Sequence, residues 1–321
     1  MIVKTYDPVT FKEKETVTNL ESIIYNKRFY KTGSFEIQTT SNAFKNNDII
    51  AYKVDNEIRS GIVMKIIEKN NTVNVLGSDL KALLDFRYIT SPTEYQGSPG
   101  EIIKQLVTEY LLTDDRTVTG FKILPDVVGG EDTVYTPEQQ YLNEAIEKFS
   151  FTNEIGINIV FDLREITFQL LKGQNKSKYI KFGREYHNIE SVEYTNDIFN
   201  TYNVGYSYDD NNEVIVAGDA KGILRRECFK EKNIEEYLVE KAPIETLRAE
   251  ANSKYRYGID YNLGDYVTVI HNNVETVKQI TEIKEVYEKN KKIIIPVFGT
   301  EKENPIKKLL KGGWCYGEYR V

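Results

Sequence analysis

Residues of the types that perform acid–base or metal chemistry are few in this chain, and they lie far apart. There are two histidines, His187 and His271, and two cysteines, Cys228 and Cys315. Histidine is the commonest acid–base group near neutral pH, and cysteines hold zinc or form disulfide frameworks when several are suitably spaced. We therefore expect surface histidines rather than a catalytic pair, and no disulfide framework or zinc site.

Ser207 is the best candidate for a nucleophile, because it lies in the run Gly-Tyr-Ser-Tyr-Asp at residues 205–209. A nucleophile elbow requires a second glycine two residues after the serine, where this chain has Asp209. The sequence also contains no glycine-rich phosphate loop, HExxH motif or CxxC pair. We expect an ordinary hairpin here and predict no catalytic residue.

Asp209, Asn211 and Glu213 place oxygen ligands at alternate positions, as at the start of a calcium-binding loop. However, Val214 stands where such a loop needs glycine, and Ala220 where it needs a bidentate glutamate. We expect a solvated turn, with calcium binding at those three residues as the alternative, and we predict no metal site and no organic cofactor. The 49 acidic residues make any glycosidase-like pair of carboxylates an arbitrary choice.

Length and composition indicate a globular protein with about two compact units. The chain has 321 residues, of which 40% are hydrophobic and 28% charged, and its net charge is −7. An acidic chain is a poor general binder of nucleic acid, and no run approaches the roughly 18 apolar residues of a membrane span. We predict no sequence-specific nucleic-acid binding and no stable membrane insertion. Because the N-terminus does not begin a signal peptide, we expect folding in a reduced cytoplasm.

β-branched and aromatic runs separated by turn residues predict strands in the first ninety residues. The runs are 35–39, 49–54 and 59–67. Asp55-Asn56 and Asn70-Asn71 are predicted hairpin turns, because asparagine tolerates the left-handed backbone that such turns need.

Helical signals appear in the middle of the chain. Ser98-Pro99-Gly100-Glu101 is a capping box with proline at the first helical position, and Thr136-Pro137-Glu138-Gln139 repeats this signal. Each precedes an apolar stripe with helical spacing. The runs 157–161 and 166–170 then predict a hairpin, so that residues 93–183 are interpreted as an α/β unit.

Strands return in the last third of the chain. Three long ones are predicted at 266–270, 274–287 and 293–298. Before them, at about 233–256, a helical interruption is predicted, in which Pro243 would begin a helix.

Two runs, 48–77 and 265–299, share an order of features. Each begins with aspartate, continues through an asparagine-containing turn, a long strand and a second turn with lysine and asparagine, and ends with glycine. Each feature is a local solution to reversing a twisted strand. Their recurrence in one order suggests duplication, and we expect the two runs to superpose as equivalent strands of two separate barrels rather than of one sheet.

The predicted fold class is β-rich α+β, with two similar β-barrel domains, an α/β insertion between them and a helical insertion in the second barrel. We expect the following domains: 1–92, a first barrel; 93–183, an α/β domain; and 184–321, a second barrel with a helical insertion at about 224–257 and a C-terminal docking tail.

Several segments resemble the hub, or tail-associated, proteins of long-tailed bacteriophages and phage tail-like particles. The strongest is the phrase Tyr-x-Leu-Gly-Asp-x-Val-Thr-Val, a tight Gly-Asp turn that leads into a barrel strand. The resemblance spans nearly the whole chain and rests on these segments: Tyr30–Ile37, Val75–Leu80, Tyr257–Val269, Ile280–Ile283 and Pro296–Gly299.

The resemblance implies a homotrimer around an axial channel, in which two barrels per chain present six similar surfaces to a six-fold tail tube. The implied partners are the tail tube or distal tail protein and a central spike or tip protein, with the tape-measure protein as an optional further partner. The implied location is the tail of a phage virion or of a DNA-free, tail-like bacteriocin, assembled in the bacterial cytoplasm. We expect a structural protein rather than an enzyme.

A second reading comes from a different class of protein: a tail-associated peptidoglycan hydrolase or carbohydrate-binding module. Some hub relatives carry peptidoglycan-cutting domains after the barrels, and we expect none here because only about twenty residues follow Gly299. The low histidine content and the lack of a catalytic motif also favour the structural hub.

Overall fold

The computed structural model describes residues 1–55, 57–125, 128–198, 201–209, 212–231, 233–240, 244–251, 254–288 and 291–299. They pack into two units. Unit 1 contains the described residues of Met1–Val192 and Arg248–Val321, and unit 2 is formed by those of Glu193–Leu247. Within these ranges, no helix combines the length and apolar character that crossing a bilayer requires.

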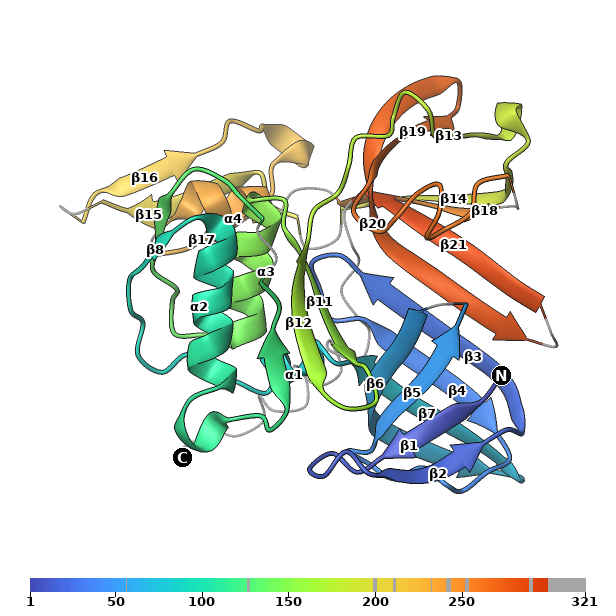
Figure 1. Ribbon diagram of the computed structural model, residues 1–321. Helices are drawn as coiled ribbons and strands as arrows, with labels where there is room; N and C mark the ends of the chain where they lie inside the picture. Colours follow the sequence, from blue (N-terminus) through green and yellow to red (C-terminus); the bar gives the residue numbers. More distant parts are fainter. Residues whose placement is uncertain are drawn as a thin grey trace. The chain divides into compact units, whose positions relative to one another are not determined.

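The N-terminal part of unit 1 is an antiparallel β-barrel, drawn in blue in Figure 1. Its strands follow the spatial order β3-β4-β7-β6-β5-β1-β2. Each strand contributes to one core, which includes Val3, Val17, Ile23, Phe35, Ile50, Val63 and Val75. The strand bounds are β1 (Val3–Tyr6), β2 (Glu13–Val17), β3 (Leu20–Arg28), β4 (Ser34–Thr39), β5 (Ile49–Val54), β6 (Glu57–Lys69) and β7 (Thr72–Asp79).

Both β-hairpin turns predicted in this barrel lie between paired strands. At the β6–β7 turn, Lys69 faces Thr72, and Asn70 and Asn71 have φ of 50° and 64°. Two consecutive left-handed residues match the right-handed twist of the flanking strands, which explains the asparagines. At the β5–β6 turn Asp55 has φ of 52°, and Asn56 lies outside the described residues.

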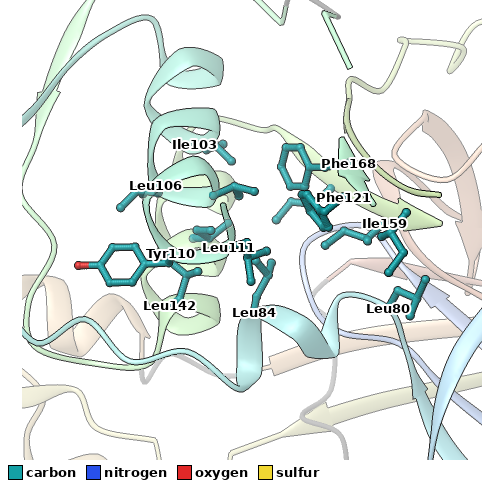
Figure 2. Packing of buried hydrophobic residues seen from close by; sticks show 14 of the residues in the cluster. Leu80, Leu84, Ile103, Leu106, Tyr110, Leu111, Phe121, Leu142, Ile159 and Phe168 are labelled. Carbon is teal, nitrogen blue, oxygen red and sulfur yellow. The ribbon is translucent and has the colours of Figure 1, made fainter. Parts of the chain in front are cut away.

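The middle of the chain forms an α/β segment within unit 1. Figure 2 shows Ile103, Leu106 and Leu111 of α2 packed with Phe121 and Phe168 from the small sheet β11-β12-β9. The elements of this segment are α1 (Ala82–Asp85), β8 (Tyr95–Gly97), α2 (Pro99–Leu111), η1 (Asp114–Arg116), β9 (Phe121–Ile123), β10 (Thr133–Tyr135), α3 (Leu142–Thr152), β11 (Gly156–Phe161) and β12 (Ile166–Leu171).

The first predicted capping box is present, but the second does not start a helix. The Ser98 hydroxyl accepts a hydrogen bond from the Glu101 N–H, and the Glu101 carboxylate accepts one from the Ser98 N–H (2.9 Å). In contrast, α3 begins at Leu142, with Tyr141 as an N-cap that makes no side-chain bond. Tyr141 forms a β-bridge with Tyr88. This pairing holds the chain extended, so the helix begins after it.

The C-terminal part of unit 1 contains a second barrel. Its core is aromatic, because the Phe182 ring lies 5.3 Å from that of Tyr261 and 5.2 Å from that of Phe298. β19 pairs with both β13 and β20, and β20 pairs with β21. The elements within unit 1 are β13 (Lys181–Phe182), η2 (Arg184–Tyr186), β19 (Tyr266–His271), β20 (Val274–Glu288) and β21 (Lys291–Gly299). Two further strands, β14 (Ile189–Asp197) and β18 (Ile244–Ala251), begin in one unit and end in the other.

The helical interruption predicted at 233–256 is only partly correct. A helix, α4, runs from Ile234 to Glu240, but residues 244–251 form strand β18. Leu247 and Ala249 are buried and alternate with half-buried Arg248 and Glu250. That alternation has the period of a strand, and it outweighs the helical spacing that suggested a second helix. Pro243 lies outside the described residues.

Unit 2 is a small sheet with one helix. The strand order is β16-β15-β17, and Ile234 of α4 is buried against Gly205 of β15. Besides α4, its elements are β15 (Val204–Tyr208), β16 (Val214–Ala217), η3 (Gly222–Leu224) and β17 (Glu227–Phe229).

Replacing Ser98 by alanine should destabilise the protein by about 1 kcal/mol, because the Glu101 N–H loses its capping acceptor. The matched control is Thr136→Ala, which removes the same hydroxyl from an exposed loop residue and should change the unfolding free energy by a few tenths of a kcal/mol at most. Urea denaturation of both variants measures the difference. Equal losses would mean that Thr136 also caps a helix.

Candidate functional site: the joint between the two barrels

The residues considered for chemistry from the sequence have ordinary structural roles in unit 2. The Ser207 hydroxyl is buried and donates to the Glu231 carbonyl oxygen (2.9 Å). The Cys228 thiol lies 3.7 Å from the Val204 carbonyl oxygen, and burial raises the pKa of that thiol. β15 and β16 form the predicted hairpin around Ser207.

The acidic loop is a closed turn where it is described. Asp209 accepts the Glu213 N–H on its carboxylate (2.7 Å) and donates its own N–H to the Glu213 carbonyl oxygen (2.9 Å). Asn211, the middle ligand of the calcium alternative, lies outside the described residues, as does Cys315. His187 is exposed and His271 is half-buried at the end of β19. Over the described ranges, no three His, Cys, Asp or Glu side chains are placed to hold a metal ion.

The duplicated runs reproduce one another down to individual hydrogen bonds, beginning with a buried aspartate. In the first barrel, the Asp48 carboxylate accepts the Lys45 N–H (3.0 Å), and its carbonyl accepts the Val63 N–H (2.9 Å). The residue before it, Asn47, has φ of 69°. Lys14 completes the site with an ion pair to the carboxylate (2.5 Å).

The second barrel repeats this turn. The Asp265 carboxylate accepts the Asn262 N–H (2.8 Å), and its carbonyl accepts the Ile280 N–H (2.9 Å). The residue before it, Gly264, has φ of 93°, and Lys176 supplies the ion pair (2.9 Å). The predicted role of Gly264 and Asp265 in the turn that begins this strand is confirmed.

The long strands that follow are also equivalent. The β6–β7 register shifts between Val63 and Lys65, and the β20–β21 register shifts between Ile280 and Glu282. Each strand therefore carries a β-bulge at the same place relative to its aspartate turn. A bulge bends a strand and increases its twist, as closing a small barrel requires.

Two expectations about the repeat are wrong. The runs do not occupy separate sheets, because the second half of β20 pairs with β3 and joins the barrels into one sheet. The closing glycines are also not equivalent: Val63 faces Gly77, whereas Ile280 faces Phe298, so Gly299 comes one position later. The order of strands and turns within each run nevertheless agrees.

The β3–β20 joint contains two buried ion pairs. Arg28 lies opposite Glu282 in the register and binds it at 2.7 Å, with both side chains at most 5% exposed. Arg59 of β6 binds Glu285 through two guanidinium nitrogens, at 2.7 Å and 3.0 Å. Because side chains of adjacent strand residues alternate between faces, Glu282 and Glu285 lie on opposite faces of β20.

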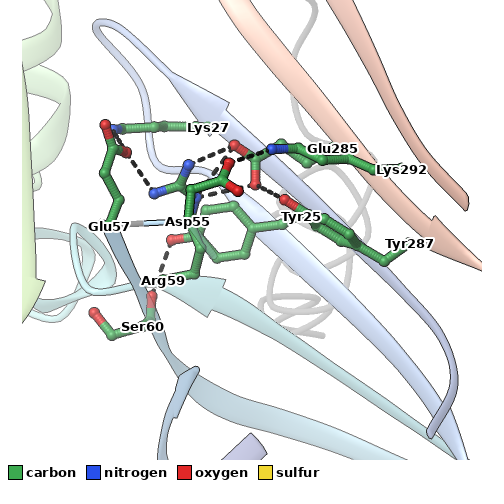
Figure 3. Close-up of polar contacts among 9 residues, drawn as sticks. All are labelled: Tyr25, Lys27, Asp55, Glu57, Arg59, Ser60, Glu285, Tyr287 and Lys292. Carbon is green, nitrogen blue, oxygen red and sulfur yellow. Dashed lines mark hydrogen bonds and ion pairs between the residues drawn. The ribbon is translucent and has the colours of Figure 1, made fainter. Parts of the chain in front are cut away.

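The Arg59–Glu285 pair is the centre of a polar cluster, shown in Figure 3. Arg59 also binds Glu57 (2.6 Å), and the Tyr287 hydroxyl donates to Glu285 (2.8 Å). Tyr25, on β3, donates instead to the Ser60 carbonyl oxygen (3.0 Å). The cluster thereby ties β3, β6 and β20 together.

Charge states in the cluster follow from burial and from neighbouring charges. Burial opposes the charge of Arg59, but the hydrogen bonds and charge of Glu285 outweigh it and raise the pKa of the guanidinium. Burial, then the Glu285 charge, raises the pKa of the Tyr287 hydroxyl. Burial, then the Arg59 charge, lowers the pKa of Lys27. The arrangement places the guanidinium of Arg59 between the carboxylates of Glu285 and Glu57.

Sequence reasoning missed Arg28, Arg59, Glu282 and Glu285 as the residues of this joint. The available signal was weak, because charged residues are common in all three strands that carry them, 20–28, 57–69 and 274–288. Partners separated by 226 and 254 positions in the chain come together only through the fold.

Comparison with known proteins gives a consistent family and fold. The sequence matches the Siphovirus ReqiPepy6 Gp37-like protein family over residues 2–232 and 231–300. No curated protein matches it.

Solved structures with the same fold include three tail or baseplate proteins. A tail protein from Neisseria meningitidis MC58 has a TM-score of 0.56 and 12% identity, covering 93% of this chain and 97% of that chain. The 43 kDa tail protein of prophage MuSo2 from Shewanella oneidensis has a TM-score of 0.57 and 11% identity, covering 92% of this chain and 96% of that chain. A chain of the phage P2 baseplate in its activated conformation has a TM-score of 0.51 and 9% identity, covering 94% of this chain and 99% of that chain.

Replacing Glu285 by glutamine should cost about 3 kcal/mol or more, because it leaves the buried Arg59 charge without its counter-charge. The control is Glu13→Gln, which breaks an ion pair of the same length (2.7 Å) whose side chains are 40% and 43% exposed, and should cost less than about 1 kcal/mol. Chemical denaturation compares the two. Similar losses would contradict a structural role for the buried pair.

Replacing Gly264 by valine should impair folding by about 2 kcal/mol or more. Its φ of +93° disfavours any side chain, and a Cβ would lie 2.2 Å from the buried Phe29 ring. Gly129→Ala is the control, because a Cβ there meets nothing within 4 Å. Thermal unfolding tests both, and a neutral Gly264→Val would refute the steric argument.

Proposed function

The chain belongs to the Siphovirus ReqiPepy6 Gp37-like protein family, and we propose that it is the structural hub of a phage tail or tail-like particle. In this proposal, three copies form a ring with two barrels each. Six similar barrels face the six-fold tail tube or distal tail protein, and the three-fold side holds a central spike or tip protein. The tape-measure protein is a further candidate partner.

The observation that carries this proposal is the recurrence of one turn and one bulged strand in both barrels, although the two barrels share one sheet. Asp48 and Asp265 form the same buried turn and lead into strands with the same bulge. A chain with two equivalent barrels occupies two neighbouring positions of a ring, so three copies supply six positions. Head-to-tail contacts between such units close into a ring when the rotation per step is right. The division into domains at 1–92, 93–183 and 184–321 is part of this proposal.

We further propose that the protein acts without catalysis. The buried charges at the joint are paired with one another and hold strands in register, and Ser207 is hydrogen-bonded within its own sheet. The alternative, a tail-associated peptidoglycan hydrolase or carbohydrate-binding module, predicts a lytic band in a peptidoglycan zymogram or retention on cell-wall polysaccharide. We expect neither.

Cryo-electron microscopy of the assembled tail should show three copies of this chain at the junction between tube and tip, with the two barrels of each copy alternating around the ring. A free monomer in light scattering is compatible with this expectation, because the tube can template the ring. Hub density with six copies or one copy would overturn the proposal.

A further inference from the structure

The strand edge that joins the two barrels within the chain has an open counterpart in each barrel. Beyond its bulge, β20 has a strand on both sides: β21 on one side and β3 on the other. At the equivalent place, residues 65–69, β6 has β7 on one side. Its other edge pairs with β5 over residues 57–62, and at 65–69 no strand pairs with that edge among the residues that the structure describes. The equivalent strand edge is therefore paired with β3 in the second barrel and unpaired in the first.

Burial follows this difference. Thr281, Glu282, Ile283 and Glu285 of β20 are buried. In β6, Lys65 and the residues 67–69 are exposed, including Ile67 at 40%. An open edge with an exposed isoleucine is a template for another strand.

The strand that fits this edge is the counterpart of β3. In the first barrel the spatial order is β3-β4-β7-β6, and in the second it is β14-β18-β21-β20, so β14 takes the place of β3. β14 ends the sheet path in the described part of the chain, and its residues 190 and 191 are exposed. Among the described strands, the outer edge of β14 is thus also open, as is that of β2 at the other end of the path.

We propose that the segment 65–69 of β6 pairs, antiparallel, with β14 of a second copy of this chain. The contact would repeat between chains the β3–β20 contact made within each chain. This inference rests on the proposed hub function and deepens it, because it names the surfaces through which neighbouring copies meet. Every barrel then joins the next through the same pair of edges, head to tail.

The register and the charges support the pairing. Within the chain, the last residue of β3, Arg28, lies opposite the first residue after the bulge, Glu282. In the corresponding strands, the first residue after the β6 bulge is Lys65 and the last residue of β14 is Asp197. The same register between copies therefore places Lys65 opposite Asp197 and Lys69 opposite Glu193.

The sign of charge is reversed between the two joints. β3 carries Lys27 and Arg28 and meets the acidic β20, whereas segment 65–69 carries two lysines and β14 carries no basic residue. β3 of another copy is not a competing partner, because both of its edges are already paired, with β20 and with β4. The two lysines of segment 65–69 outweigh Glu68 and attract the acidic β14, which favours β14 of another copy as the partner strand.

Zero-length carbodiimide cross-linking of the full chain tests the proposal. Equal amounts of ¹⁴N- and ¹⁵N-labelled protein are mixed at the highest soluble concentration, and cross-linked peptides are identified by mass spectrometry. We expect a Lys69–Glu193 product that joins light and heavy peptides. Lys292 and Asp55, 2.7 Å apart within one chain, supply the internal control, which should join peptides of the same label. Absence of the mixed Lys69–Glu193 product, or mixed products at β2 instead, would overturn the proposal.

Charge variants give a second test. Lys65→Glu with Lys69→Glu should raise the dissociation constant of self-association by roughly tenfold or more. Adding Glu193→Lys and Asp197→Lys, at the β14 positions that this register places opposite Lys69 and Lys65, should restore association, because the attraction is rebuilt with opposite signs. Lys45→Glu with Lys53→Glu is the matched control: it makes the same change in net charge at exposed residues of the first barrel and should leave association unchanged.

Thermal unfolding of all variants checks that each one folds. Equal weakening by the test and control pairs, or no restoration in the quadruple variant, would refute the strand pairing.

The outcomes separate this inference from the hub function. Three copies in the tail with another contact surface would leave the hub function standing and refute the strand pairing. The mixed Lys69–Glu193 product together with a different copy number in the tail would support the strand pairing and refute the three-copy hub.

Discussion

The pairing of β20 with β3 is the interaction on which the arrangement of the barrels depends. An exposed strand edge carries backbone N–H and C=O groups that need hydrogen-bond partners. Here β3 of the first barrel and β20 of the second barrel pair with each other and supply those partners. The Arg28–Glu282 and Arg59–Glu285 pairs lie on opposite faces of this joint and are buried. Buried charges are costly unless they are matched, so a slip in register would be penalised on both faces.

The barrels themselves are built from a local device used twice. A buried aspartate closes a turn, a lysine neutralises it, and a long strand with a bulge follows. This device needs only a few residue types, because hydrogen bonds to one carboxylate and one left-handed residue define the turn. The remaining positions are free to differ, and the edges of the two barrels consequently carry different charges.

The insertion between β14 and β18 takes a place where the first barrel has a short connection. β3 and β4 are joined by residues 29–33, whereas β14 and β18 are separated by the segment that contains β15, β16, β17 and α4. Insertions of this kind are tolerated at loop ends, because the strands that flank them keep their pairing. The two barrels therefore share an order of strands and turns, while the connections between their strands differ in length.

The buried charges at the joint are paired with one another. Fixed, mutually satisfied charges give a contact its orientation and exclude wrong partners more than they add affinity. In the proposed ring, the edge geometry that joins the barrels within one chain would be used again between neighbouring chains.

Local patterns in the sequence were enough to predict the strands around Asp48 and Asp265, the Asn70-Asn71 turn, the Ser98 cap and the β-rich α+β class. Each of these depends on neighbouring residues, whose spacing is visible in the chain. The start of α3 at Leu142, the strand at 244–251 and the sharing of one sheet by both barrels depended on tertiary structure. In each case a distant partner decided the outcome: Tyr88 bridged Tyr141, β14 and β21 flanked the strand at 244–251, and β3 met β20. Pairing between distant strands is settled by which edges meet in space, and no local pattern encodes that.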